Sequence, residues 1–134
     1  MVWTWQLYRD EEGEIPDELI SAFYYLLEDS LDSLKEGIDP ALSEQQSSSL
    51  RVKIKKLCDF YPKSLSSDDI DSFDDGFYEL RLIGKGYSYR FTFMQISPQV
   101  FLFLDAFMKN YSGSTRKKDL AATRYRFNKI KPKK

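Results

Sequence analysis

The chain has 134 residues, of which 42% are hydrophobic and 16% aromatic. This composition suits one folded domain with a real core and argues against disorder. The sequence has no histidine and one cysteine, which excludes a Ser-His-Asp triad and zinc sites built on imidazole or on several thiolates. It also lacks a Walker loop and a dinucleotide fingerprint. If the chain is an enzyme, its catalysis depends on Arg, Lys, Tyr, Asp or Glu side chains.

The net charge of −1 hides a strong separation of charge along the chain. Residues 1–76 contain 7 lysines and arginines against 18 acidic residues, a net charge of −11. Residues 77–134 contain 13 against 3, a net charge of +10. This asymmetry predicts either a basic surface for a polyanion or an attraction between the two halves. A third interpretation is that acidic helices merely solvate one side of the protein.

Features of a secreted or membrane protein are absent from the sequence. No apolar run approaches the roughly 20 residues that a membrane-spanning helix needs. The first ten residues lack the basic-then-apolar layout of a signal peptide. The single cysteine, Cys58, fits a small buried hydrophobe rather than half of an internal disulfide. We therefore expect a cytoplasmic protein without membrane contact, with one domain over residues 1–134.

The first half of the chain is predicted to form one strand, two helices and a long loop. Residues 2–8 alternate as a strand does. Apolar residues recur at helical spacing from Asp17 to about residue 34. After the polar connector SEQQSSS, a second helix is expected from about Ser48 to Phe60, because Pro62 cannot continue it. It is followed by a Ser- and Asp-rich loop, KSLSSDDIDSFDDG.

The second half is predicted to form three antiparallel strands over residues 77–109, joined by the turns GKG and SPQ. Alternation predicts that each strand places charged residues on a face that is otherwise aromatic. On the third strand, one face is expected to hold Phe103, Asp105, Phe107 and Lys109. A short basic helix is expected from Ser114. The fold class is therefore α+β, with two N-terminal helices packed on a small antiparallel sheet.

Several motifs, taken in order, resemble the RelE/HigB superfamily of small toxins, and in particular its phage-derived HigB-like branch. The matches are a YRDxxGxxP turn at residues 8–16, Glu-Leu-Arg at 79–81 and Tyr-Arg at 89–90. A further strand then ends in Lys109, before a threonine-containing loop and a basic helix. The sequence differs from the family at Asp105 and Ala106, where the family has histidine and glycine. It also has acidic residues where the family has lysines before Glu-Leu-Arg.

The resemblance covers nearly the whole chain and implies a RelE/ParE-like toxin fold. It implies the toxin of a type II toxin–antitoxin module, a ribosome-dependent endoribonuclease that cuts messenger RNA without a metal or cofactor. The implied partners are messenger RNA on the ribosome and a cognate antitoxin that covers the basic face.

Charge builds on a phosphate in the transition state of RNA cleavage, so arginines held on rigid strands would stabilise that state. The catalytic candidates are Arg81, Arg90, Lys109 and Asp105, and Tyr89 is a further acid–base candidate. The RNA-binding candidates are Lys85, Arg116, Lys117, Lys118 and Arg124.

Other interpretations of the same residues remain open. Arg81 and Arg90 also fit cross-strand pairing with Glu79 or with the acidic loop. The acidic residues 68–75 fit either an internal mimic of RNA lying against the basic sheet or a flexible surface loop. For function, the alternatives are a non-catalytic ParE-like toxin that binds a protein target such as gyrase, and an inactive phage-derived relic of the fold.

Overall fold

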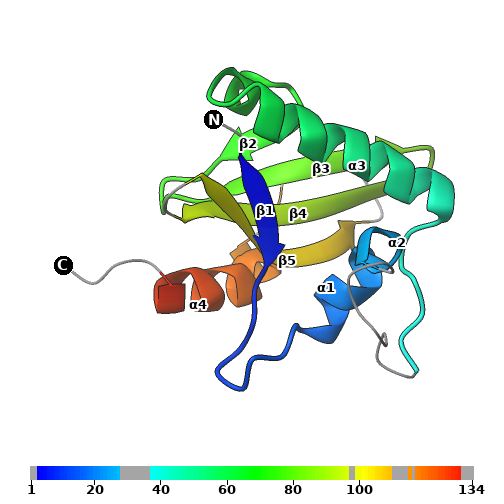
Figure 1. Ribbon diagram of the computed structural model, residues 1–134, viewed down its shortest axis with the longest axis horizontal. Coiled ribbons are helices and arrows are strands. Elements are labelled where there is room, and N and C mark those ends of the chain that lie inside the picture. Colours follow the sequence, from blue (N-terminus) through cyan, green and yellow to red (C-terminus); the bar gives the residue numbers. More distant parts are fainter. Residues whose placement is uncertain (1–2, 28–36, 97–98, 110–114, 116, 131–134) are drawn as a thin grey trace.

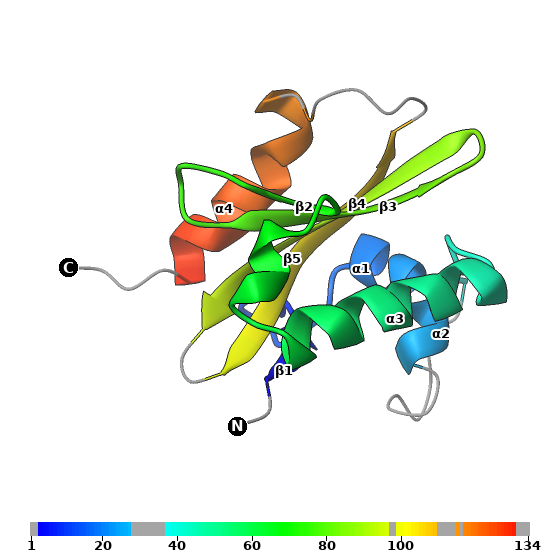
Figure 2. The ribbon, with the colours of Figure 1, turned by 90° about the horizontal axis from the view of Figure 1, so that it is seen from above.

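A computed structural model describes residues 3–27, 37–96, 99–109, 115 and 117–130. The elements, in chain order, are β1 (Thr4–Leu7), α1 (Asp17–Ala22), α2 (Tyr24–Leu27), α3 (Glu44–Asp59), the 3-10 helix η1 (Lys63–Ser66), β2 (Ile70–Ser72), β3 (Tyr78–Gly84), β4 (Tyr87–Ile96), β5 (Val100–Lys109), the 3-10 helix η2 (Lys117–Leu120) and α4 (Ala121–Ile130). The described strands form one sheet (Figure 1). Helices α1, α2 and α3 cover one face of this sheet, and α4 covers the other (Figure 2). The α+β class is confirmed.

The sheet is larger than expected and is mixed rather than antiparallel. Its order is β1-β5-β4-β3-β2, and the β3-β4-β5 meander is antiparallel as predicted. At one edge β1 pairs parallel to β5, from Thr4 opposite Val100 to Leu7 opposite Phe103. At the other edge β2 pairs antiparallel to β3. Alternation predicts that a segment is a strand but not which strand lies beside it, so the place of β1 was not predicted.

The first predicted helix is divided into two short ones. The helix α1 ends at Ala22, and the backbone N–H of the next residue, Phe23, closes its last turn on the Leu19 carbonyl. A second short helix, α2, then begins at Tyr24. The rest of the expected helix, residues 28–36, lies outside the described part of the chain.

The helix α3 begins earlier than expected, inside the stretch that was predicted to be a polar connector. Ser43 Oγ accepts a hydrogen bond from the Gln46 backbone N–H at 3.0 Å. Gln46 Oε1 accepts one from the Ser43 backbone N–H at 2.8 Å. This reciprocal capping box satisfies the donors that a helix N-terminus leaves unpaired, and it starts the helix at Glu44.

The predicted long loop before the meander contains structure of its own. It includes η1 and the edge strand β2, whose Ile70 is buried opposite Leu80 of β3. Burial of Ile70, together with the packing of Phe73 on Phe77, attaches a mostly polar stretch to the sheet. We call residues 68–75, which contain β2, the acidic segment.

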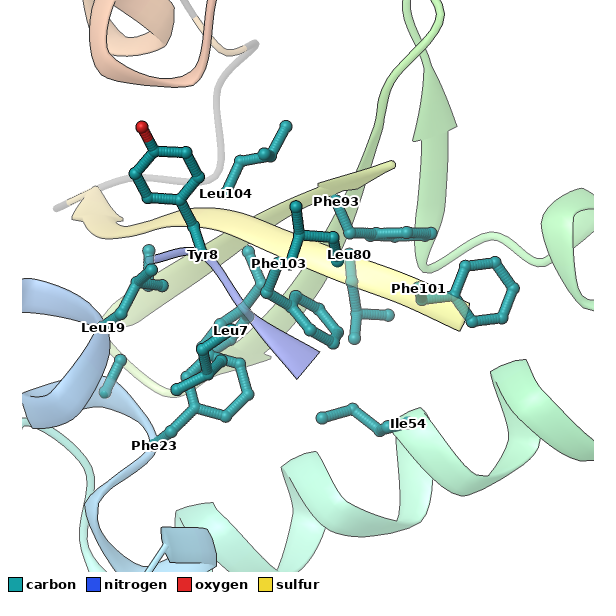
Figure 3. Close-up of a cluster of buried hydrophobic side chains, with 14 of the residues drawn as sticks. Leu7, Tyr8, Leu19, Phe23, Ile54, Leu80, Phe93, Phe101, Phe103 and Leu104 are labelled. Carbon is teal, nitrogen blue, oxygen red and sulfur yellow. The ribbon is translucent and has the colours of Figure 1, made fainter. Parts of the chain in front are cut away.

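The main core lies between the sheet and the helices α1 to α3 (Figure 3). Phe23 is central to it, with its ring centroid 5.1 Å from that of Phe103 and 5.5 Å from that of Phe91. Trp5 of β1 packs on Phe23 at 5.4 Å. Cys58 of α3 is buried as predicted, and this burial raises the pKa of its thiol to about 11. Aromatic contacts thus join the first strand, the first helices and the last strand.

A bulge in β5 overturns one predicted face. Phe103 pairs with Phe93 and Asp105 pairs with Thr92, so Leu104 is an extra residue on β5. Because side chains alternate along a strand, one extra residue reverses which face the following residues occupy. Phe103 therefore lies in the core beneath α1, and Asp105 faces α4. The prediction that these two residues share a face is wrong.

Among the helices that the described residues form, none has both the length and the apolar character required to cross a membrane.

Candidate functional site

The four predicted catalytic side chains lie on the face of the sheet that α4 covers. Arg81 of β3 stands opposite Arg90 of β4, and Arg90 stands opposite Phe107 of β5. Asp105 and Lys109 flank Phe107 on the same face, because alternate residues of a strand point the same way. The strands thus gather residues from three separate sequence motifs.

Arg90 lies in a buried polar network. Its side chain is 1% exposed, and that of its partner Glu79 is 0% exposed. Arg90 Nη1 donates to Glu79 Oε1 at 2.8 Å and to Thr115 Oγ1 at 2.9 Å, and Nε donates to Ser88 Oγ at 2.9 Å. The Thr115 hydroxyl in turn donates to the second oxygen of Glu79. The interpretation that Arg90 pairs with Glu79 is confirmed, and the pairing is what allows two charges to be buried there.

Arg81 points in another direction, toward the edge of the sheet. Its Nη1 lies 3.2 Å from a carboxylate oxygen of Asp71 in the acidic segment. Its Nη2 donates to the backbone carbonyl of Asp68 at 2.7 Å. The side chain keeps 24% of its surface exposed. Pairing of Arg81 with the acidic stretch is confirmed, so the two neighbouring arginines are held in separate ion pairs.

Lys109 and Asp105 lie beneath the C-terminal elements. The Nζ atom of Lys109 is 2.9 Å from Asp119 of η2, and the lysine itself is buried. Asp105 is also buried, 3.4 Å from Arg126 of α4.

Burial changes the titration of two acid–base candidates. It raises the pKa of Asp105 to about 6, although a backbone hydrogen bond from Ala106 and the charge of Arg126 act in the opposite direction. Burial also raises the pKa of Tyr89, and the charges of Asp105 and Glu18 add to this effect. A carboxyl group that titrates near 6 is closer to the working range of a general acid or base than an ordinary aspartate.

The predicted RNA-binding cations come from a turn of the sheet and from the C-terminal elements. Lys85 is exposed in the β3–β4 turn, and Lys117 and Lys118 are exposed on η2. Arg124 of α4 lies 3.2 Å from Asp75 and faces the Phe77 ring, with 5.9 Å between its guanidinium carbon and the ring centroid. The remaining candidate, residue 116, lies outside the described part of the chain.

Several polar residues that lie between the sheet and α4, which we call the polar layer, were not predicted as part of the site. Thr92 and Thr123 share a hydrogen bond of 2.7 Å between β4 and α4, and both are buried. Arg126 donates to the Leu104 carbonyl at 2.7 Å and binds Glu18 of α1 at 2.5 Å. No spacing in the sequence links such partners, because they come from elements that meet only in the folded protein.

Within the described residues, no group of three or more cysteine, aspartate or glutamate side chains is arranged to hold a metal ion. Comparison with known protein families finds no family that matches the chain, and comparison with curated proteins finds no match either. The fold and the site therefore define the protein only as an α+β domain with a mixed five-stranded sheet and a polar layer beneath its C-terminal helix.

Proposed function

We propose that this chain is a toxin of the RelE/HigB type that acts on messenger RNA at the ribosome. The observation that carries the proposal is the meeting of Arg81, Arg90 and Lys109 on one face of the sheet. These residues come from the motifs that resemble the family. The order of elements, a strand, helices, a meander and a basic helix, agrees with what the resemblance implies.

These side chains differ in burial, and we assign them different roles for that reason. Arg81, with 24% of its side chain exposed, is the one that reaches the surface and would stabilise negative charge on a phosphate. Arg90 acts as a positioning residue, because it holds Glu79 and Thr115 inside the fold. Asp105 and Lys109 are covered by α4 and η2, so RNA reaches them only if those elements move.

Exposed lysines supply further positive charge for RNA binding. Lys85, Lys117 and Lys118 are exposed and suit contacts with phosphates along a single strand. In this proposal a cognate antitoxin neutralises the protein by covering the same cations.

A second candidate function is a non-catalytic toxin that binds a protein target, as the ParE branch does. The observation that favours it is the burial of Arg90, Lys109 and Asp105, which removes three of the four catalytic candidates from the surface. A protein-binding toxin needs no exposed catalytic group, so this burial would not impair it.

Expression of the chain alone in bacterial cells tests both candidates. For the nuclease, we expect growth to stop and messengers to be cut. In a cleavage assay on purified ribosomes, Arg81→Ala is expected to lower the rate on the order of 100-fold, the effect of losing one donor to a transition-state anion. The matched control is Arg51→Ala, which removes an exposed arginine from α3 on the opposite face of the sheet. It should leave cleavage unchanged.

The contrary outcomes separate the candidates. Growth arrest with intact messengers, unaffected by Arg81→Ala, would favour the protein-binding toxin. High soluble expression without any growth defect would exclude both kinds of toxin.

A further inference from the structure

The acidic segment makes contacts that the resemblance does not imply. Its Asp71 lies 3.2 Å from Arg81 of β3, and its Asp75 lies 3.2 Å from Arg124 of α4. The backbone carbonyl of Asp68 accepts a further hydrogen bond from Arg81 at 2.7 Å. The segment is therefore bound to the predicted catalytic residue Arg81 and to the predicted RNA-binding residue Arg124, as the hypothesis of a segment lying against the basic residues requires.

The two arginines lie along one stretch of the chain, from Phe77 to Arg81. Arg124 lies over Phe77, which precedes Arg81 by four residues along the same stretch of chain. Four residues of extended chain span about 13 Å, so the arginines stand roughly that far apart along this stretch. Their side chains keep 24% and 32% of their surface exposed, and a ligand can therefore reach both.

The aspartates do not use all the hydrogen-bonding capacity of these arginines. Arg81 Nε and Arg124 Nη1 are buried and have no hydrogen-bond partner among the described residues. Because both atoms are covered by protein, an anion can use these two donors only after the groups that cover them have moved. Phosphate suits these arginines, because the arginine fork binds phosphate and carboxylate by the same geometry.

We propose that Arg81 and Arg124 form a phosphate-binding edge for single-stranded RNA, and that Asp71 and Asp75 occupy this edge when RNA is absent. The proposal rests on the proposed RNA-directed function and adds to it an internal competitor. The aspartates belong to the same chain, so they are present at a high effective concentration and must be displaced before RNA binds.

The competition is weak enough to be reversed by RNA. Both ion pairs are partly exposed, and pairs of this kind contribute little individually. An RNA strand that also contacts Lys85, Lys117 and Lys118 gains several phosphate contacts at once, so it can displace the segment. Removing the two carboxylates is expected to tighten RNA binding about 2- to 30-fold.

Fluorescence anisotropy with a labelled single-stranded RNA oligonucleotide, using the full chain across a salt series, tests the proposal. Asp71→Asn/Asp75→Asn should bind more tightly than the wild type. It should also show a steeper dependence of log affinity on log salt, because in the wild type salt weakens the competing ion pairs as well as the RNA contacts. The matched control is Glu12→Gln/Asp59→Asn, which changes the net charge equally at exposed sites away from this edge.

Further variants locate the effect. Adding Arg81→Gln and Arg124→Gln to the Asn variant should abolish the gain in affinity. The single variants Asp71→Asn and Asp75→Asn should each show part of it, which keeps the test valid if the double variant folds poorly.

Equal affinities and slopes for the Asn variant and the charge control, with RNA still bound, would overturn the competition and leave the proposed function standing. If no variant binds RNA even at low salt, both the competition and the RNA-directed function fail.

Discussion

Glu79 and Arg90 have almost no contact with solvent, and each is the ion-pair partner of the other inside the protein. Arg90 also donates hydrogen bonds to the hydroxyl groups of Ser88 and Thr115. The four side chains therefore form one hydrogen-bonded network. A buried pair of this kind contributes little beyond what apolar residues of similar volume would contribute. Removing one partner is different, because the other charge is then buried without compensation.

We therefore predict opposite outcomes for single and double replacements. Arg90→Met and Glu79→Gln should each lower the free energy of unfolding by about 3–5 kcal/mol, whereas Glu79→Leu/Arg90→Met should recover most of that loss. Urea denaturation followed by circular dichroism measures all three. Arg81→Met, which breaks a partly exposed pair, is the control and should cost about 0–1 kcal/mol. A loss of under 1 kcal/mol for Arg90→Met would show that the pair is not buried as described.

At the scale of elements, the capping box decides where the longest helix begins. Ser43 and Gln46 satisfy each other's backbone donors, and this outweighs the poor helix propensity of the serines that follow. Two serines of the same stretch should thus respond oppositely to alanine. Ser43 is a cap, whereas Ser48 is an exposed residue in the helix interior.

Ser43→Ala is expected to lower the free energy of unfolding by about 1 kcal/mol, because it removes the cap. Ser48→Ala should raise it by a few tenths of a kcal/mol, since alanine is the better helix former. Thermal and urea unfolding of the two variants provide the measurement. If both variants shifted the free energy of unfolding in the same direction, the result would contradict the start of α3 at Glu44.

The sequence predicted the meander and the main helices because their patterns are local. Aromatic and polar residues alternate without interruption from Tyr87 to Phe93, and the turn before them contains Gly86 with a φ of 81°. The acidic segment gave no such pattern, because Ile70 alone is buried among polar residues. The prediction that Phe103 shares a face with Asp105 failed because one extra residue in β5 reverses the alternation and leaves no mark in the sequence. Partners such as Asp75 and Arg124 are set by tertiary packing, which local patterns do not encode.

At the scale of the whole molecule, the separation of charge becomes a set of contacts between the two halves. Glu18 of α1 binds Arg126 of α4, and Glu11 binds Lys129 of the same helix. The acidic segment adds its ion pairs with Arg81 and Arg124. The hypothesis that the two halves attract each other is confirmed by these pairs, and the small net charge of the chain follows from the same balance.

We predict that salt destabilises the protein. Raising NaCl from about 0.1 M to about 1 M shortens the screening length from roughly 10 Å to 3 Å. The exposed ion pairs between the halves should weaken, and the free energy of unfolding should fall by about 1–2 kcal/mol in total. Urea titrations at the two salt concentrations measure the change. In the variant Glu11→Gln/Glu18→Gln, salt should lower the free energy of unfolding by less than in the wild type. An equal decrease would show that these two ion pairs do not cause the salt effect.

The parallel pairing of β1 with β5 has a consequence for the protein's synthesis. Residues 4–7 leave the ribosome well before their partners at 100–103, which lie 96 positions further along the chain. At about 5–20 residues per second, the wait lasts roughly 5–20 seconds. Throughout that interval Trp3 and Trp5 have no β5 to pack on, and closing so long a loop is slow. The sheet that carries Arg81 and Arg90 is therefore complete only after β5 has left the ribosome.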